Sequence, residues 1–108
     1  MKHFLRVILS VFICLMISLQ VIAGNEDIVK KNIVQQAKTM GVDPAIALGI
    51  AQVESGFRQN VTGSGGHIGV FQLSKHTAKH LGVDPYKMED NVKGGILYYK
   101  KMYRPPGE

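Results

Sequence analysis

Apolar residues recur at helical spacing in several short segments of this sequence. Residues 25–40 carry an apolar stripe that predicts a helix with one buried face, formed by Val29, Ile33, Ala37 and Met40. Gly41 predicts the end of this helix. Residues 44–55 are apolar almost all round, so we expect a central, buried helix there. Asp43 and Pro44 predict its capped start, and its end is expected near Glu54.

Glycine-rich loops and shorter helices follow. Glycine loses much backbone entropy on folding, so Gly-Ser-Gly-Gly at residues 63–66 predicts a loop. Residues 69–73 predict either one helical turn or an extended piece. Ser74 and Gly82 predict the cap and the stop of a third helix. A last helix is expected over residues 90–103, ended by Arg-Pro-Pro-Gly at residues 104–107, with a stripe of Val92, Ile96, Tyr99 and Tyr103. No segment in which apolar and polar residues alternate is long enough to predict a β-strand. The predicted fold class is therefore all-α or nearly so.

Residues 1–23 differ from the rest of the chain. A short basic segment that contains Lys2 and Arg6 precedes an apolar stretch, which ends at a potential cleavage site after Ala23. This order is typical of a cleaved secretory signal. A membrane anchor is the alternative, but the stretch is shorter than the ~20 residues that a spanning helix needs. A lipoprotein is disfavoured because Cys14 lies too early and follows Ile13 rather than a small residue. We therefore expect a signal peptide over residues 1–23, one exported domain over residues 24–108, and membrane contact through the signal alone.

Removal of that signal leaves 85 residues, enough for one small domain, and lowers the formal charge from +5 to +3 because Lys2 and Arg6 are lost. Cys14 is the only cysteine, so the mature chain has no thiol for a disulfide, a thiolate zinc site or a nucleophile. The mild positive charge suits an anionic polymer. The basic residues are scattered, which argues against a nucleic-acid partner.

Glu54 is the first candidate for chemistry because it lies at the C-terminal end of an apolar helix. The helix dipole at that end and the expected burial both disfavour an ionised carboxylate. A carboxyl group that is held protonated near neutral pH can protonate a glycosidic oxygen. The ordinary alternative is an exposed glutamate that simply ends its helix.

Three motifs occur in order along the chain: Glu-Ser-Gly-Phe at residues 54–57, Gly-Val-Phe-Gln at residues 69–72, and Asn-Val-Lys-Gly-Gly-Ile-Leu-Tyr-Tyr at residues 91–99. This set resembles the soluble lytic transglycosylase family, which shows Glu-Ser-Gly-Phe, then Gly-Leu-Met-Gln, then Asn-Ile-x-x-Gly-x-x-Tyr-Leu. The resemblance covers about residues 28–102 and implies a lysozyme-like helical domain.

The resemblance also implies an activity and a set of site residues. Glu54 matches the family's catalytic acid and base, and substrate-binding roles are implied for Ser55, Gly69, Gln72 and Tyr98. The implied reaction cleaves the β-1,4 bond between N-acetylmuramic acid and N-acetylglucosamine in peptidoglycan, with the sugar's own 6-hydroxyl as nucleophile and a 1,6-anhydro end as product. One carboxylate is enough, and no metal or organic cofactor is implied. Small family members accompany secretion, conjugation or pilus machines, so such an apparatus in the periplasm or cell envelope is an expected partner beside the glycan strands.

One departure from the family pattern leaves alternatives open. The family's domain continues to an Ala-Tyr-Asn-x-Gly motif that has no counterpart before Glu108, so we expect a C-terminally incomplete domain with an open groove and a wetter Glu54. A second hypothesis is then a peptidoglycan-binding or assembly module with little or no turnover. A third is a lysozyme-type hydrolase.

Two further patterns are weaker. His76 and His80, spaced for one helix face, could bind a metal ion together with His67, although the sequence lacks the zinc-peptidase glutamate between them. Gly-Val-Asp-Pro occurs at residues 41–44 and again at residues 82–85, which we interpret as two helix boundaries rather than a duplicated domain.

Overall fold

The computed structural model describes residues 2–103, with the backbone alone described for residues 17–24. The stop predicted at residues 104–107 lies outside the described residues. The described chain contains α1 (Lys2–Thr39), α2 (Pro44–Ser55), the 3-10 turn η1 (Ser64–Gly66), α3 (Lys75–Leu81) and α4 (Met88–Met102). Extended structure within residues 2–103 is limited to isolated bridges that pair Ile68 with Thr62 and with Leu73. The predicted all-α class is therefore confirmed.

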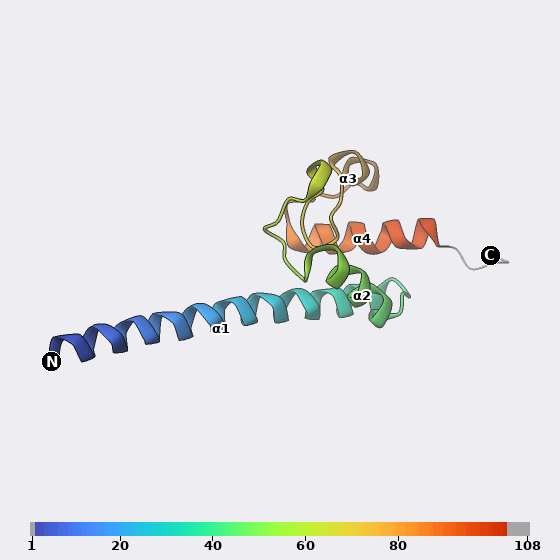
Figure 1. The fold of residues 1–108 in the computed structure, drawn as a ribbon. Coiled ribbons are helices and arrows are strands. Elements are labelled where there is room, and N and C mark those ends of the chain that lie inside the picture. Colours follow the sequence, from blue (N-terminus) through green and yellow to red (C-terminus); the bar gives the residue numbers. More distant parts are fainter. Residues whose placement is uncertain (1, 104–108) are drawn as a thin grey trace.

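The helices are arranged around α4 (Figure 1). α1 contacts both α2 and α4, whereas α3 contacts α4 on the side away from α1. The N-terminal half of α1 projects away from the other helices, which gives the molecule a length of 73 Å against 27 and 19 Å in the other two directions. Within the described chain, α1 therefore packs against α2 and α4 through the part that lies nearest its C-terminal end.

α1 begins at Lys2, so the predicted start of the first helix near residue 25 is wrong. Residues 2–23 contain no glycine or proline that would interrupt a helix, and Gly24 alone costs about 1 kcal/mol relative to alanine. Glu26 and Asp27 consequently lie in the middle of α1 and not in a first turn. Within the part of the chain that is described, no helix is both long and apolar enough to cross a membrane.

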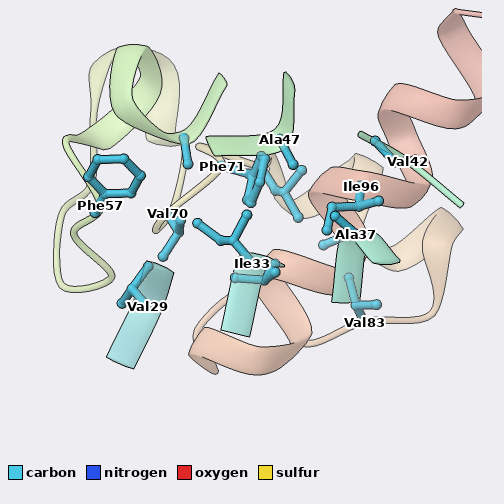
Figure 2. Packing of buried hydrophobic residues seen from close by; sticks show 14 residues of the cluster. Val29, Ile33, Ala37, Val42, Ala47, Phe57, Val70, Phe71, Val83 and Ile96 are labelled. Atoms are coloured by element: carbon cyan, nitrogen blue, oxygen red, sulfur yellow. The ribbon is translucent and has the colours of Figure 1, made fainter. Parts of the chain in front are cut away.

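The core forms where the apolar stripe of α1 meets the rest of the molecule. Val29, Ile33 and Ala37 are buried as predicted, and the more distal Met40 packs against them half-buried. Figure 2 shows Ile33 in the middle of the cluster, with Val70 on one side and Ile96 on the other. Residues 2–16 are all exposed and contribute nothing to this core.

The predicted caps fix the ends of α2 and α3. Asp43 Oδ1 accepts a hydrogen bond of 2.9 Å from the Ala45 N–H, and Pro44 occupies the first helical position. Ser74 Oγ accepts one of 3.0 Å from the Thr77 N–H, and Gly82 ends α3 in the left-handed conformation. Helix boundaries set by such local chemistry were predictable.

The prediction that α2 is buried all round is wrong. Only Ala47, Ala51 and Ser55 of this helix are buried, whereas Ile46 is 42% and Val53 is 85% exposed. The small side chains of α2 let α1 and the turn at residues 69–72 pack closely against one face. No described residue covers the opposite face, so α2 presents apolar side chains to solvent.

The predictions for the glycine-rich loop and for the last helix hold in part. The glycine-rich segment at residues 63–66 is a loop except for the single turn η1, which contains Gly65 in a non-helical conformation. α4 starts two residues before the predicted position, and Val92 and Ile96 of its stripe are buried. Tyr103 lies at the end of that stripe, beyond the packed core, and is exposed.

Candidate active site

A tight turn at residues 69–72 lies between the two bridged residues Ile68 and Leu73. The N–H of each of these residues donates to the carbonyl of the other, both at 2.9 Å. Gly69 and Gln72 both have positive φ, 75° and 51°. The segment is therefore neither the helical turn nor the extended piece that the sequence left open, but a hairpin-like turn whose two ends take left-handed conformations.

Three polar side chains hold this turn in place. Ser55 Oγ, buried at the end of α2, donates a 2.7 Å hydrogen bond to the carbonyl of Val70. Gln59 Oε1 accepts from the Val70 N–H at 3.2 Å, and Asn91 Oδ1 accepts from the Phe71 N–H at 2.8 Å. Buried backbone groups outside helices and sheets need such partners. The turn is consequently fixed to both α2 and α4.

Gly69 is needed at its position for two reasons. Its φ of 75° is one that residues with a side chain rarely adopt. A Cβ at this position would also collide with the side-chain amides of Asn91 and Gln59. Gly69 therefore lets the two amides approach the turn, and it lies buried rather than in contact with solvent.

An open cleft of about 410 Å³ lies over this turn. Its walls come from α2, the loop before the turn, the turn itself, the start of α3, and α4. The polar side chains on these walls include Glu54, His67, Gln72, Thr77 and Tyr98. Of the five site residues predicted from the sequence, the cleft brings Glu54, Gln72 and Tyr98 together. Ser55 and Gly69 are buried and do not line it.

Glu54 is exposed, so the expected burial of its carboxyl is wrong, whereas the exposure agrees with the wetter Glu54 expected for an open groove. The residue is the last but one of α2, and it lines the cleft opposite the walls formed by the turn and α4. Its carboxylate has no hydrogen-bond or ion-pair partner among residues 2–103. The carboxylate is thus open to water and to any polymer that enters the cleft.

Gln72 is held firmly in the cleft. Its Nε2 donates to the Gly69 carbonyl at 2.9 Å and, more weakly, to the Val61 carbonyl at 3.4 Å. Its Oε1 lies so close to Gly63 that a Cβ there would collide with it. A left-handed conformation costs a residue with a side chain about 1–2 kcal/mol. Such strain is concentrated at functional sites, where the surrounding structure enforces it.

Tyr98 forms the α4 wall of the cleft with its side chain 44% exposed. α4 can approach the turn closely because Gly95 lies one helical turn before Tyr98, and a Cβ on Gly95 would collide with the Phe71 ring. The ring of Tyr99 stacks on that of Tyr103, the residue just after α4, with centroids 5.1 Å apart, and both also line the cleft. Aromatic rings therefore form most of this wall.

The sequence reasoning did not single out the two amides that hold the turn. Asn91 is fully buried, and its Nδ2 also donates to the carbonyls of Ile68 and Pro85, both at 2.8 Å. A polar amide beside the apolar stripe of α4 must find buried hydrogen-bond partners, and this feature of the sequence could have revealed the role of Asn91. Gln59 Nε2 likewise donates to the Pro85 carbonyl at 2.9 Å, but nothing in the surrounding sequence marks it.

A second, larger cleft of about 620 Å³ lies between α1 and the loop that follows α2. Its acidic residue, Glu26, forms an ion pair of 3.3 Å with Lys30 of the same helix, and Lys30 Nζ also lies 4.8 Å from the centre of the Phe57 ring. The Glu26 carboxylate is thus already engaged by Lys30, whereas the Glu54 carboxylate has no ion-pair partner among residues 2–103. Chemistry rather than volume therefore favours the Glu54 cleft as the active site.

The histidines do not gather into one site. His76 and His80 lie side by side on α3 with ring centroids 4.4 Å apart, whereas His67 lines the Glu54 cleft. In the described part of the chain, no three histidine, cysteine or acidic side chains lie close enough together to hold a metal ion.

Comparison with known protein families gives one match over most of the chain. The family model described as the transglycosylase SLT domain matches residues 31–108. This range includes all three motifs and every residue that lines the Glu54 cleft. No solved structure matches the chain significantly.

Proposed function

Because this chain belongs to the transglycosylase SLT domain family, whose members are lytic transglycosylases acting on peptidoglycan, we propose that it cleaves glycan strands with Glu54 as its acid and base. One observation carries this proposal. Glu54, Gln72 and Tyr98 come from three separate sequence motifs, and they line the same cleft. Peptidoglycan lies in the cell envelope, so the substrate class also indicates where the protein works.

The proposed reaction needs a single carboxyl group. Glu54 first donates its proton to the oxygen that joins N-acetylmuramic acid to N-acetylglucosamine, and the bond from that oxygen to C1 of the muramic acid breaks. The 6-hydroxyl of the same muramic acid then attacks C1, and the Glu54 carboxylate takes up the hydroxyl proton. No water is consumed, the carboxyl is regenerated, and the muramic acid carries a 1,6-anhydro ring.

In this proposal, two of the other site residues bind the glycan strand and two hold the turn in position. Gln72 and Tyr98 contact the strand. A sugar hydroxyl can replace the long 3.4 Å contact of Gln72 Nε2, and the exposed Tyr98 ring can cover the apolar face of a sugar. Ser55 and Gly69 are positioning residues, since both are buried and hold the turn that carries Gln72.

The exposure of Glu54 favours a second candidate function. A carboxyl that is open to water, with no partner among the described side chains, lacks the surroundings that assist a general acid. The chain would then be a peptidoglycan-binding or assembly module with little turnover. Gln72 and Tyr98 would serve binding in the same cleft, and Glu54 would be dispensable.

We also propose that the protein is exported and that residues 1–23 are removed as a signal peptide. The arrangement of α1 supports this. Among the α1 residues whose side chains are described, the core residues all follow residue 24, while residues 2–16 are exposed along their whole length. The family association with secretion, conjugation or pilus machines suggests that the enzyme opens the wall locally for such an apparatus.

Product chemistry tests the proposed reaction. The purified full chain is incubated with insoluble peptidoglycan, and the soluble products are examined by mass spectrometry and by a reducing-end assay. The proposal predicts muropeptides that end in anhydro rings, without new reducing ends. New reducing ends would identify a lysozyme-type hydrolase instead. Tight binding to the polymer with no soluble product would favour the binding module.

A further inference from the structure

The C-terminal end of α4 presents two stacked aromatic rings that the proposed reaction does not use. The rings of Tyr99 and Tyr103 lie with centroids 5.1 Å apart and planes inclined by 25°. We call this pair the tyrosine platform. Both residues line the Glu54 cleft, as Tyr98 does. Figure 1 shows this end of α4 extending past α3 to the edge of the molecule, so the platform continues the aromatic wall of the cleft outward.

The two rings of the platform differ in their surroundings. Tyr99 is half-buried and packs against the hydrophobic core. Tyr103 is 68% exposed and rests on Tyr99. The stacked contact covers one face of the Tyr103 ring, so its exposed area lies largely on the opposite face and the ring edge. The platform therefore has an anchored inner ring and an open outer ring.

The outer ring is positioned before any ligand arrives. The Tyr103 N–H donates a 2.9 Å hydrogen bond to the Tyr99 carbonyl, which continues the helical pattern to the residue that ends α4. Side chains four residues apart on a helix lie on the same face, where an apolar pair is stabilising. A tyrosine side chain has only two rotatable χ angles to fix. Because the Tyr103 ring is already held, little further entropy is lost when a ligand stacks on it.

The chemistry of the open ring suits a sugar. The face of an aromatic ring is electron-rich, and a pyranose ring presents on one of its faces C–H groups of opposite partial charge. The platform contributes no ionised group, so it suits an uncharged sugar better than a charged peptide. Tyr98 and Tyr103 are five residues apart, a separation of about 7.5 Å along a helix. The two exposed rings therefore face different parts of a strand in the cleft.

We infer that the tyrosine platform binds a sugar ring of the glycan strand, at a subsite beyond the one that Tyr98 covers. The inference rests on the proposed function, because it takes a glycan strand as the polymer in the cleft. The continuity of the cleft supports it, since one cleft is lined by Glu54, Tyr98 and Tyr103. A strand that follows the α4 wall passes from Tyr98 onto Tyr103. The platform strengthens binding of the strand and takes no part in proton transfer.

A binding assay that does not depend on turnover tests this inference. The parent protein is the full chain with Glu54→Gln, so that the polymer is not consumed, and co-sedimentation measures its affinity for insoluble peptidoglycan. Tyr103→Leu removes the flat ring but keeps an apolar side chain, whereas Tyr103→Phe keeps the ring. Tyr86→Leu is the matched control, because Tyr86 is 60% exposed and lines neither cleft. Each protein is also measured on polymer stripped of its peptide stems by an amidase.

We expect Tyr103→Leu to bind intact polymer about three- to tenfold more weakly than the parent and the Tyr86→Leu control, the size of one aromatic stacking contact. The same loss should appear on stripped polymer, because the ring contacts sugar and not peptide. The loss should not shrink as salt is raised, since salt screens charges and the stacked contact carries none. Tyr103→Phe should bind like the parent.

Chemical protection tests the same contact without changing any tyrosine. Tetranitromethane nitrates exposed tyrosine rings, and mass spectrometry of the digested protein locates the nitro groups. Saturating peptidoglycan should lower the nitration rate of Tyr103 in the parent protein and leave that of Tyr86 unchanged. Circular dichroism establishes that every variant remains folded, and if Tyr103→Leu does not, this protection experiment decides the question.

Four results would overturn the inference: equal affinities of Tyr103→Leu and Tyr86→Leu for intact polymer, a loss confined to intact polymer, a Tyr103→Phe variant as weak as Tyr103→Leu, or unchanged nitration of Tyr103 on bound polymer. Failure of the proposed reaction would look different. A chain with Glu54 intact that releases no product, but whose Glu54→Gln form still binds the polymer through Tyr103, would lose its enzymatic role and keep the platform.

Discussion

Gln72 combines backbone strain with a place in the cleft. Its left-handed conformation is enforced by the bridged pair that flanks the turn and by the hydrogen bonds of its own amide. Glycine would adopt this conformation without strain. The presence of a longer polar side chain there indicates that the side chain contributes something other than stability.

The first prediction separates the two contributions of Gln72. Gln72→Gly and Gln72→Ala both remove the amide, but only the glycine variant relieves the left-handed strain. We expect the glycine variant to be about 1 kcal/mol more stable than the alanine variant in urea unfolding. Product release should fall by about two- to tenfold in both, since a lost hydrogen bond to the strand is worth about 0.5–1.5 kcal/mol. Equal stabilities would show that the turn relaxes, and undiminished release would remove Gln72 from the site.

At the scale of elements, close helix packing depends on small residues at particular places. Gly95 of α4 faces the Phe71 ring, and this contact sets the distance between α4 and the turn. Gly49 of α2 is different, because a Cβ there would meet no atom within 4 Å. The two helical glycines therefore form a matched pair for testing how the cleft is built.

The second prediction uses this pair. Gly95→Ala forces the turn and α4 apart, and we expect it to destabilise the chain by about 1–3 kcal/mol and to lower product release. Gly49→Ala should stabilise by about 0.5–1 kcal/mol, because alanine favours the helix and nothing opposes its methyl group. Thermal unfolding followed by circular dichroism measures both changes. A Gly95→Ala variant as stable as the original chain would contradict the packing described for α4.

Elements were predictable from the sequence where local chemistry decides them. The caps at Asp43 and Ser74 and the stop at Gly82 follow from side chains within a few residues of each helix end. The burial of α2 was not predictable, because an apolar sequence does not reveal which of its faces another helix covers. The same limit applies to the site. The motifs indicated Glu54, Gln72 and Tyr98, which line one cleft, but the buried amides of Gln59 and Asn91 act through backbone groups that are distant in sequence.

At the scale of the whole molecule, α1 has two parts with different surroundings. Its C-terminal part supplies Val29, Ile33 and Ala37 to the core, whereas residues 2–16 touch solvent throughout. Large apolar side chains exposed in this way are a liability in a mature protein. They are expected in a segment that export machinery recognises and removes.

The third prediction follows from this division. When the full chain is exported from a bacterial host, the envelope fraction should contain a protein whose first residue is Gly24, as determined by intact mass and terminal sequencing. The processed chain should retain its helical circular dichroism, because its core lies after the cleavage position. A chain that remains at full length in the membrane fraction would show instead that residues 1–23 act as an anchor.

The measurement that tests the central claim most directly compares anhydro-muropeptide release by the unmodified full chain, by Glu54→Gln and by Glu89→Gln. Glu89 is the matched control, because it is exposed, lies on α4 and lines neither cleft. If Glu54 donates and accepts the proton, its replacement should lower the rate by at least about 10²-fold, whereas Glu89→Gln should leave it unchanged. Release that continues at the original rate in a folded Glu54→Gln variant would contradict the assignment of Glu54 as the catalytic acid.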